Sequence, residues 1–122
     1  MKWKNYIFVF INILIMCEEK GERMDKIRIL GIISDFIEHS KKPKEYYIHG
    51  GCYIFATYLK TKVNDIQIYY LKNEYHFIVE YQKKLYDITG NVTNKYKESK
   101  KISEEEMIQR YPKLIKQYRK SE

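Results

Sequence analysis

The sequence predicts an α+β domain in which two N-terminal helices pack on a small antiparallel sheet and a short helix lies near the C-terminus. Residues 25–39 and 51–62 carry apolar side chains at helical spacing. Residues 66–89 instead hold β-branched and aromatic runs separated by turn residues. With 122 residues and 44% apolar side chains, the chain can form one domain with a modest core.

The first helix is predicted from Asp25, a favourable N-cap residue, to about His39. Its core-facing side is made of aliphatic and aromatic residues, namely Ile29, Leu30, Ile33, Phe36 and Ile37. The segment Ser40–Pro43 then ends the helix, because proline disfavours helical backbone in the residue before it.

A short extended stretch is predicted at Tyr46–Ile48, with a turn at His49–Gly51. A second helix follows from about Gly51 to Lys62, because apolar side chains recur there at helical spacing. The stripe that faces the sheet consists of Cys52, Phe55, Ala56, Leu59 and Val63. Cys52 therefore stands in the first turn of this helix.

Three strands are predicted next. Ile66–Leu71 is rich in β-formers, and Tyr75–Tyr81 alternates between two faces. A turn at Lys83–Lys84 then leads into a returning strand, Leu85–Thr89. The tail from residue 91 to 101 is polar and is expected to be a loop.

A capping box predicts the last helix. Ser103 is followed three residues later by Glu106, a spacing typical of helix N-termini. The helix is expected from Glu104 to about Arg110, ending before Pro112.

The first 23 residues form a segment distinct from the domain, which is assigned to residues 24–122. Lysines followed by an apolar run, Tyr6–Met16, resemble a signal peptide or a short membrane anchor. Alternatively, the codons for Lys20–Glu22 encode a ribosome-binding site and translation starts at Met24. The protein is expected to be cytoplasmic in that case, and otherwise membrane-associated or exported.

Composition limits the classes of site and partner. The net charge of +7 is consistent with an anionic partner, but no nucleic-acid motif accompanies it, so nucleic acid is not an expected partner. Two cysteines do not make a disulfide framework, and the scattered histidines show no zinc-binding spacing. We expect no cofactor and no metal.

Three residues suggest nucleophilic chemistry. Cys52 follows two glycines at a helix start, where free backbone N–H groups and the helix dipole favour a thiolate. His76 opens one strand and Asp87 lies on the next. A hairpin loop of two or four residues would put His76 and Asp87 on one face of the sheet. Asp87 could then orient the imidazole toward the sulfur. His49 is a rival base.

The sequence resembles the core shared by transglutaminase-like and papain-like cysteine enzymes. The resemblance rests on Gly50–Ala56, Tyr75–Glu80 and Leu85–Gly90, and it covers roughly Pro43–Val92. It also extends to small proteins of Firmicutes and their phages. It implies a papain-like minimal core and catalytic roles for the Cys, His and Asp of these segments. Unlike papain-like enzymes, the chain has no glutamine upstream of the cysteine; a tyrosine hydroxyl is one substitute.

Two functions remain open at this point. The first is a thiol-dependent hydrolase or acyltransferase (peptidase, deamidase or transglutaminase-like) that acts on a peptide or protein through a thioester intermediate. The second is a catalytically inactive binding module of phage or mobile-element origin with a basic surface. A membrane is a partner only if residues 6–16 are a genuine anchor, and the sequence does not indicate the oligomeric state.

Overall fold

The computed structural model describes residues 24–120. The chain divides into two compact units, Met1–Gly31 and Ile32–Glu122. Within the first unit the described residues, 24–31, are helical. The predicted leader, residues 1–23, lies outside the described residues. None of the helices in residues 24–120 combines the length and apolar character that crossing a bilayer requires.

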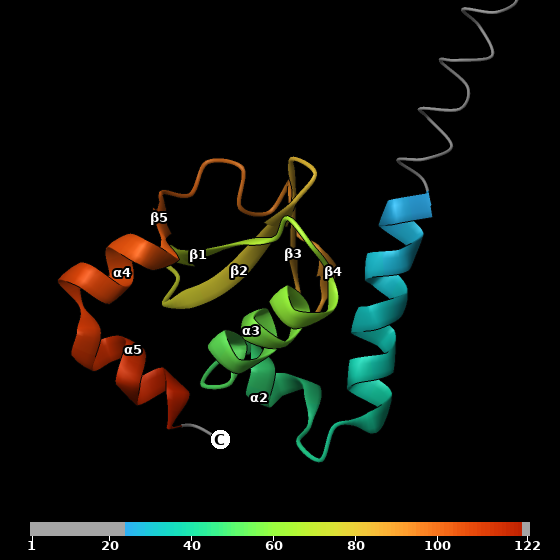
Figure 1. Cartoon of the computed structure of the whole chain (residues 1–122), viewed down its shortest axis with the longest axis horizontal. Coiled ribbons are helices and arrows are strands. Elements are labelled where there is room, and N and C mark those ends of the chain that lie inside the picture. Colours follow the sequence, from blue (N-terminus) through green and yellow to red (C-terminus); the bar gives the residue numbers. More distant parts are fainter. Residues whose placement is uncertain (1–23, 121–122) are drawn as a thin grey trace, which may run out of the picture. The chain divides into compact units, whose positions relative to one another are not determined.

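The second unit is an α+β fold, as predicted (Figure 1). At its N-terminal end, residues 32–39 are helical. The remaining elements are α2 (Lys44–Ile48), α3 (Cys52–Lys62), β1 (Gln67–Leu71), β2 (His76–Tyr81), β3 (Lys84–Asp87), β4 (Gly90–Asn91), β5 (Lys101–Ser103), α4 (Glu104–Arg110) and α5 (Pro112–Arg119). The strands form one antiparallel sheet in the order β4-β3-β2-β1-β5.

The last turns of the N-terminal helix hold an aromatic cluster. The ring of Phe36 lies 4.8 Å from Tyr47, 5.0 Å from Phe55 and 4.7 Å from Tyr58, measured between ring centroids. Ile33 is buried as predicted, whereas Ile37 is exposed. Asp25 lies inside the helix rather than at its cap, because residue 24 is already helical.

The predicted extended stretch at Tyr46–Ile48 is wrong, because this segment belongs to the short helix α2. Pro43 precedes the helix with an extended backbone, and its carbonyl accepts a hydrogen bond from the N–H of Tyr46 at 3.1 Å. The β propensity of Tyr-Tyr-Ile is overridden by packing, because the buried ring of Tyr47 has its place against Phe36.

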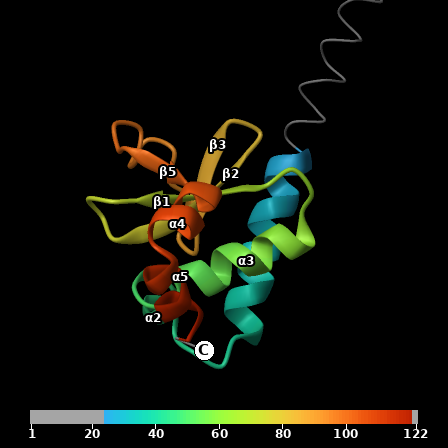
Figure 2. The same ribbon diagram turned by 60° about the vertical axis from the view of Figure 1, so that its left-hand side comes forward.

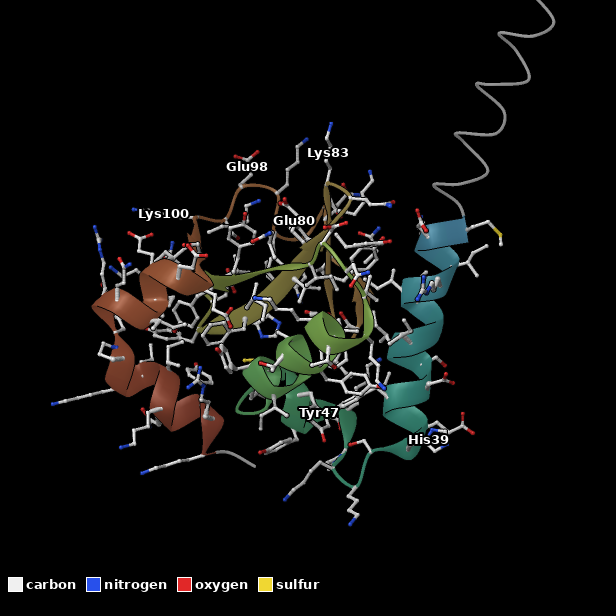
Figure 3. The ribbon with its side chains drawn as sticks, viewed as in Figure 1. His39, Tyr47, Glu80, Lys83, Glu98 and Lys100 are labelled. Atoms are coloured by element: carbon white, nitrogen blue, oxygen red, sulfur yellow. The ribbon has the colours of Figure 1, made fainter. Side chains whose placement is uncertain are left out.

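The hairpin β2–β3 closes one residue earlier than predicted. Tyr81 pairs with Lys84, so the two loop residues are Gln82 and Lys83. Both have positive φ angles, 48° and 64°, which is the backbone of a type I′ turn. Figure 3 shows Lys83 at the tip of this hairpin. The loop length is therefore even, which is the condition under which His76 and Asp87 were predicted to lie on the same face of the sheet.

Both faces of the sheet are covered. Helix α3 packs against one face of the sheet (Figures 1 and 2). This face carries Phe77, whose ring meets that of Tyr53 edge-on with the centroids 4.6 Å apart. The opposite face carries a second apolar cluster, made of Leu71, Ile78, Leu85, Val92 and Tyr96. The segment after β4, expected to be a solvated loop, therefore supplies core residues.

The C-terminal region contains more regular secondary structure than the sequence predicted. The predicted N-cap is present, with the Ser103 hydroxyl accepting from the Glu106 N–H, and α4 has the predicted bounds. The short strand β5 was not predicted; it pairs with β1. Helix α5 was also not predicted, because Pro112 was interpreted only as a helix breaker. Proline at the first helical position is instead a favourable start, since its missing N–H needs no partner there.

Candidate nucleophilic site

Cys52 is the first residue of α3, and Gly51 is its N-cap. A helix N-terminus leaves backbone N–H groups without intrahelical partners and carries partial positive charge. Glycine is required before the cysteine for a steric reason. A Cβ on Gly51 would lie 2.5 Å from Cε1 of Tyr46, closer than a side chain can approach. The sulfur of Cys52 therefore lies in the first turn of α3, directly after a glycine that is packed against the ring of Tyr46.

His76 and Asp87 form a buried pair. His76 opens β2 and Asp87 ends β3, and each is 3% exposed. Nε2 of His76 lies 2.9 Å from Oδ2 of Asp87. Because Val79 pairs with Tyr86, the register puts both side chains on the same face of the sheet.

Thr89 completes the environment of the carboxylate. Its backbone N–H donates to Oδ1 of Asp87 at 2.8 Å, and its hydroxyl donates to the same oxygen. Burial acts to raise the pKa of Asp87, but the hydrogen bonds from His76 and Thr89 outweigh burial and hold it below its usual value. Asp87 is therefore ionised at neutral pH and available to orient the imidazole.

The pKa of His76 is raised to about 9. Burial alone would lower it, but the hydrogen bond with Asp87 and the neighbouring Cys52 act in the opposite direction and prevail. Nδ1 of His76 is buried and makes no hydrogen bond of regular geometry. Asp87 therefore fixes Nε2 of the ring. Cys52 is close enough to raise the pKa of the same ring.

The sulfur of Cys52 lies at the start of β2, where that strand is not yet paired with β3. The ladder between β2 and β3 begins only at Val79, so it does not include the N–H of Phe77. That N–H donates instead to Sγ of Cys52, at 3.4 Å. Phe77 directly follows His76, and Cys52 raises the pKa of the His76 ring, so the structure brings together the three residues singled out in the sequence, on α3, β2 and β3.

The sulfur is enclosed by aromatic residues. Cys52 is 1% exposed. Tyr118, on α5, places its ring 5.0 Å from that of Phe77, and its hydroxyl donates to the carbonyl of Tyr75 at 3.3 Å. Burial and the hydrogen bond with Tyr70 raise the pKa of Tyr118, and Cys52 adds to this effect. The C-terminal helix therefore contributes to the wall around the sulfur.

The other candidate ligands and bases lie elsewhere. His49, the rival base, is exposed at the C-cap of α2. Within residues 24–120 there is no group of three or more His, Cys, Asp or Glu side chains that could hold a metal ion.

Three contributors were not predicted from the sequence. Thr89 could have been found, because Asp followed two residues later by Thr is a common side-chain-to-backbone turn pattern. Tyr96, whose ring lies 6.0 Å from that of His76, and Tyr118 could not, since each comes from a distant segment. No local sequence pattern links them to the site.

Comparison with known proteins identifies the family of the chain. A family model described as "Phage YunG-like protein" matches residues 29–121, while neither the curated proteins nor the solved structures provide a match. The predicted membership of the transglutaminase-like and papain-like enzymes, with its implication of a cysteine-protease-like protein, is therefore wrong. The three short motifs on which it rested reflect a local arrangement of a helix and a hairpin, and they do not indicate family membership. The resemblance to small phage proteins, by contrast, agrees with the match. The chain belongs to the Phage YunG-like protein family.

Proposed function

We propose that this protein performs thiol-dependent acyl transfer or hydrolysis on a peptide or protein carbonyl, with Cys52 as the nucleophile. One observation carries the proposal. The buried ring of His76 is hydrogen-bonded to Asp87 through Nε2, while Nδ1 has no regular hydrogen bond and Cys52 acts on the same ring. A buried nitrogen without a partner costs on the order of 1–3 kcal/mol, and such groups in folded proteins often have a function.

The proposed chemistry assigns one role to each residue. The sulfur of Cys52 attacks the acyl carbon as a thiolate, and a C–S bond forms while the carbonyl electron pair moves to oxygen. The imidazolium of His76 gives its proton to the leaving group as the carbonyl re-forms. Water then attacks the thioester and gives a proton to His76, so that the acid and the thiolate are released. Asp87 orients the ring and stabilises its positive charge.

Part of the protein must move away from the sulfur before a substrate can reach it. Cys52 is 1% exposed, so the described arrangement is closed. Helix α5 is the segment whose displacement would uncover the site, because only Ile115 among its residues is buried, while Tyr118 packs on Phe77, whose N–H contacts the sulfur. Elements with few buried apolar residues open at low free-energy cost.

The test is turnover of an activated ester such as 4-nitrophenyl acetate by the full chain. The chain has a second cysteine, Cys17, so all variants carry Cys17→Ser. We expect nitrophenolate release above the rate of the uncatalysed reaction, lost in Cys52→Ser and strongly reduced in His76→Gln. Circular dichroism checks that each variant is folded. Turnover that persists in folded Cys52→Ser would refute the proposal.

A second candidate function is a catalytically inactive binding module of phage origin. The closed sulfur and the net charge of +7 favour it, because a basic protein attracts acidic partners without chemistry at the thiol. It predicts binding to an acidic polymer, such as heparin, that weakens steeply with salt and is unchanged in Cys52→Ser. Salt-independent or absent binding would exclude this function.

A further inference from the structure

Two buried side-chain polar atoms in the described part of the chain lack a hydrogen-bond partner: Nδ1 of His76 and the hydroxyl of Tyr46. The first belongs to the site described above. The second needs its own explanation, because a buried hydroxyl that leaves water without finding a partner costs on the order of 1–3 kcal/mol.

The ring of Tyr46 is fixed against the residue that precedes Cys52. A Cβ on Gly51 would lie 2.5 Å from Cε1 and 2.6 Å from Cδ1 of this ring, so the ring occupies the space that a side chain would need. The backbone is fixed too, since the carbonyl of Tyr46 accepts a hydrogen bond from the N–H of Gly51 at 2.8 Å.

Two other neighbours hold the same ring. Tyr47 meets it edge-on, with the centroids 5.1 Å apart, and Nζ of Lys42 lies 5.3 Å from its centroid. The hydroxyl of Tyr46 is therefore a donor in a fixed position, on a ring in contact with the entrance to α3. Pre-positioned donors of this kind are effective in stabilising developing charge.

Attack by Cys52 creates a negative oxygen that needs donors. The backbone N–H of Cys52 is one candidate, because the first N–H groups of a helix have no intrahelical partner. The N–H of Phe77 is already used by the sulfur. We propose that the Tyr46 hydroxyl donates the second hydrogen bond to this oxyanion, an inference that rests on the proposed function of Cys52.

Tyr47, which is labelled in Figure 3, lies on the same helix α2 and provides a matched control. Its hydroxyl is 2.7 Å from Oγ of Ser40 and so already has a partner. Tyr47→Phe and Tyr46→Phe each remove one hydroxyl from α2, but only the second removes a donor that has no partner within the described structure.

Two reactions of the same sulfur separate this role from a structural one. Acylation by 4-nitrophenyl acetate passes through an oxyanion: the C–S bond forms, charge collects on the carbonyl oxygen, and 4-nitrophenolate leaves with its electron pair. Alkylation by iodoacetamide displaces iodide from carbon and forms no oxyanion. The quantity to measure is the ratio of the two second-order rate constants at Cys52, in the full chain carrying Cys17→Ser.

We expect Tyr46→Phe to lower the acylation rate by about 100-fold, a typical cost of losing one oxyanion donor, while the alkylation rate stays unchanged. Tyr47→Phe should leave the ratio as it is. An unchanged ratio in Tyr46→Phe, or a parallel fall of both rates, would overturn the role of Tyr46 while leaving Cys52 as the nucleophile. No acylation of Cys52 even without the Tyr46 substitution would instead refute the proposed function itself, and this inference with it.

Discussion

Replacing Asp87 by Asn tests the electrostatics on which the proposed site depends. The hydrogen bond between Nε2 of His76 and Oδ2 of Asp87 is the largest of the effects that raise the pKa of His76. Burial opposes it. In Asp87→Asn we therefore expect the pKa of His76 to fall from about 9 toward its ordinary value of 6.5 or below.

The magnitude follows from the difference between these two values. The shift from 6.5 to about 9 is roughly 2.5 pKa units, and each unit corresponds to about 1.4 kcal/mol, so the interactions of protonated His76 stabilise the fold by on the order of 3 kcal/mol. Because the folded pKa is the higher one, this contribution is fully present below about pH 6.5 and is lost as the pH rises through about 9.

Two assays measure the effect. NMR titration of the His76 ring gives its pKa, and urea unfolding at about pH 6.5 and about pH 9 gives the loss of stability between them. The unfolding free energy should fall across this range in the unmodified protein and much less in Asp87→Asn. Asp35→Asn, at an exposed position, is the matched control and should behave like the unmodified protein. A His76 that titrates near 6.5 before any substitution would refute the reasoning.

Three further substitutions probe the surroundings of the site. Gly51→Ala should destabilise the protein by about 1–3 kcal/mol in urea unfolding, because its Cβ would meet the ring of Tyr46. Ser103→Ala should cost about 1 kcal/mol in the same assay, since it removes the side-chain cap of α4. Tyr118→Ala should speed the alkylation of Cys52 by iodoacetamide several-fold, because it opens the aromatic wall beside the sulfur.

Each of these outcomes can fail in a distinct way. A fully stable Gly51→Ala protein would mean that the ring of Tyr46 moves freely. No loss of stability in Ser103→Ala would show that the cap contributes nothing measurable. Unchanged alkylation in folded Tyr118→Ala would mean that α5 does not control access to Cys52, and the opening assigned to this helix would have to be sought elsewhere.

Local patterns were sufficient to predict much of the fold. The stripe at Cys52, Phe55 and Leu59 identified α3, because helix periodicity is decided within a single element. The capping box at Ser103 located the start of α4 for the same reason. The sequence also predicted that His76 and Asp87 share a face of the sheet, although it put the turn one residue too late. Moving a two-residue loop by one position leaves its length even, and only the even length matters for that prediction.

The errors have a common physical origin. α2 forms where local propensity favours a strand, because its aromatic side chains are fixed by contacts with Phe36 and Gly51. β5 exists only through pairing with β1. The same limit applies to the site. Its three principal residues could be suggested by their order in the chain, whereas Tyr96 and Tyr118 come together with them only in the folded protein.

The most direct measurement is peptide mapping by mass spectrometry after brief exposure of the folded full chain to 4-nitrophenyl acetate. We predict one acetyl group on Cys52 that is lost again within the turnover time, and that forms much more slowly when His76 is replaced by Gln. Acetylation confined to lysines, or an acetyl group on Cys52 that forms equally in the His76 variant, would contradict it.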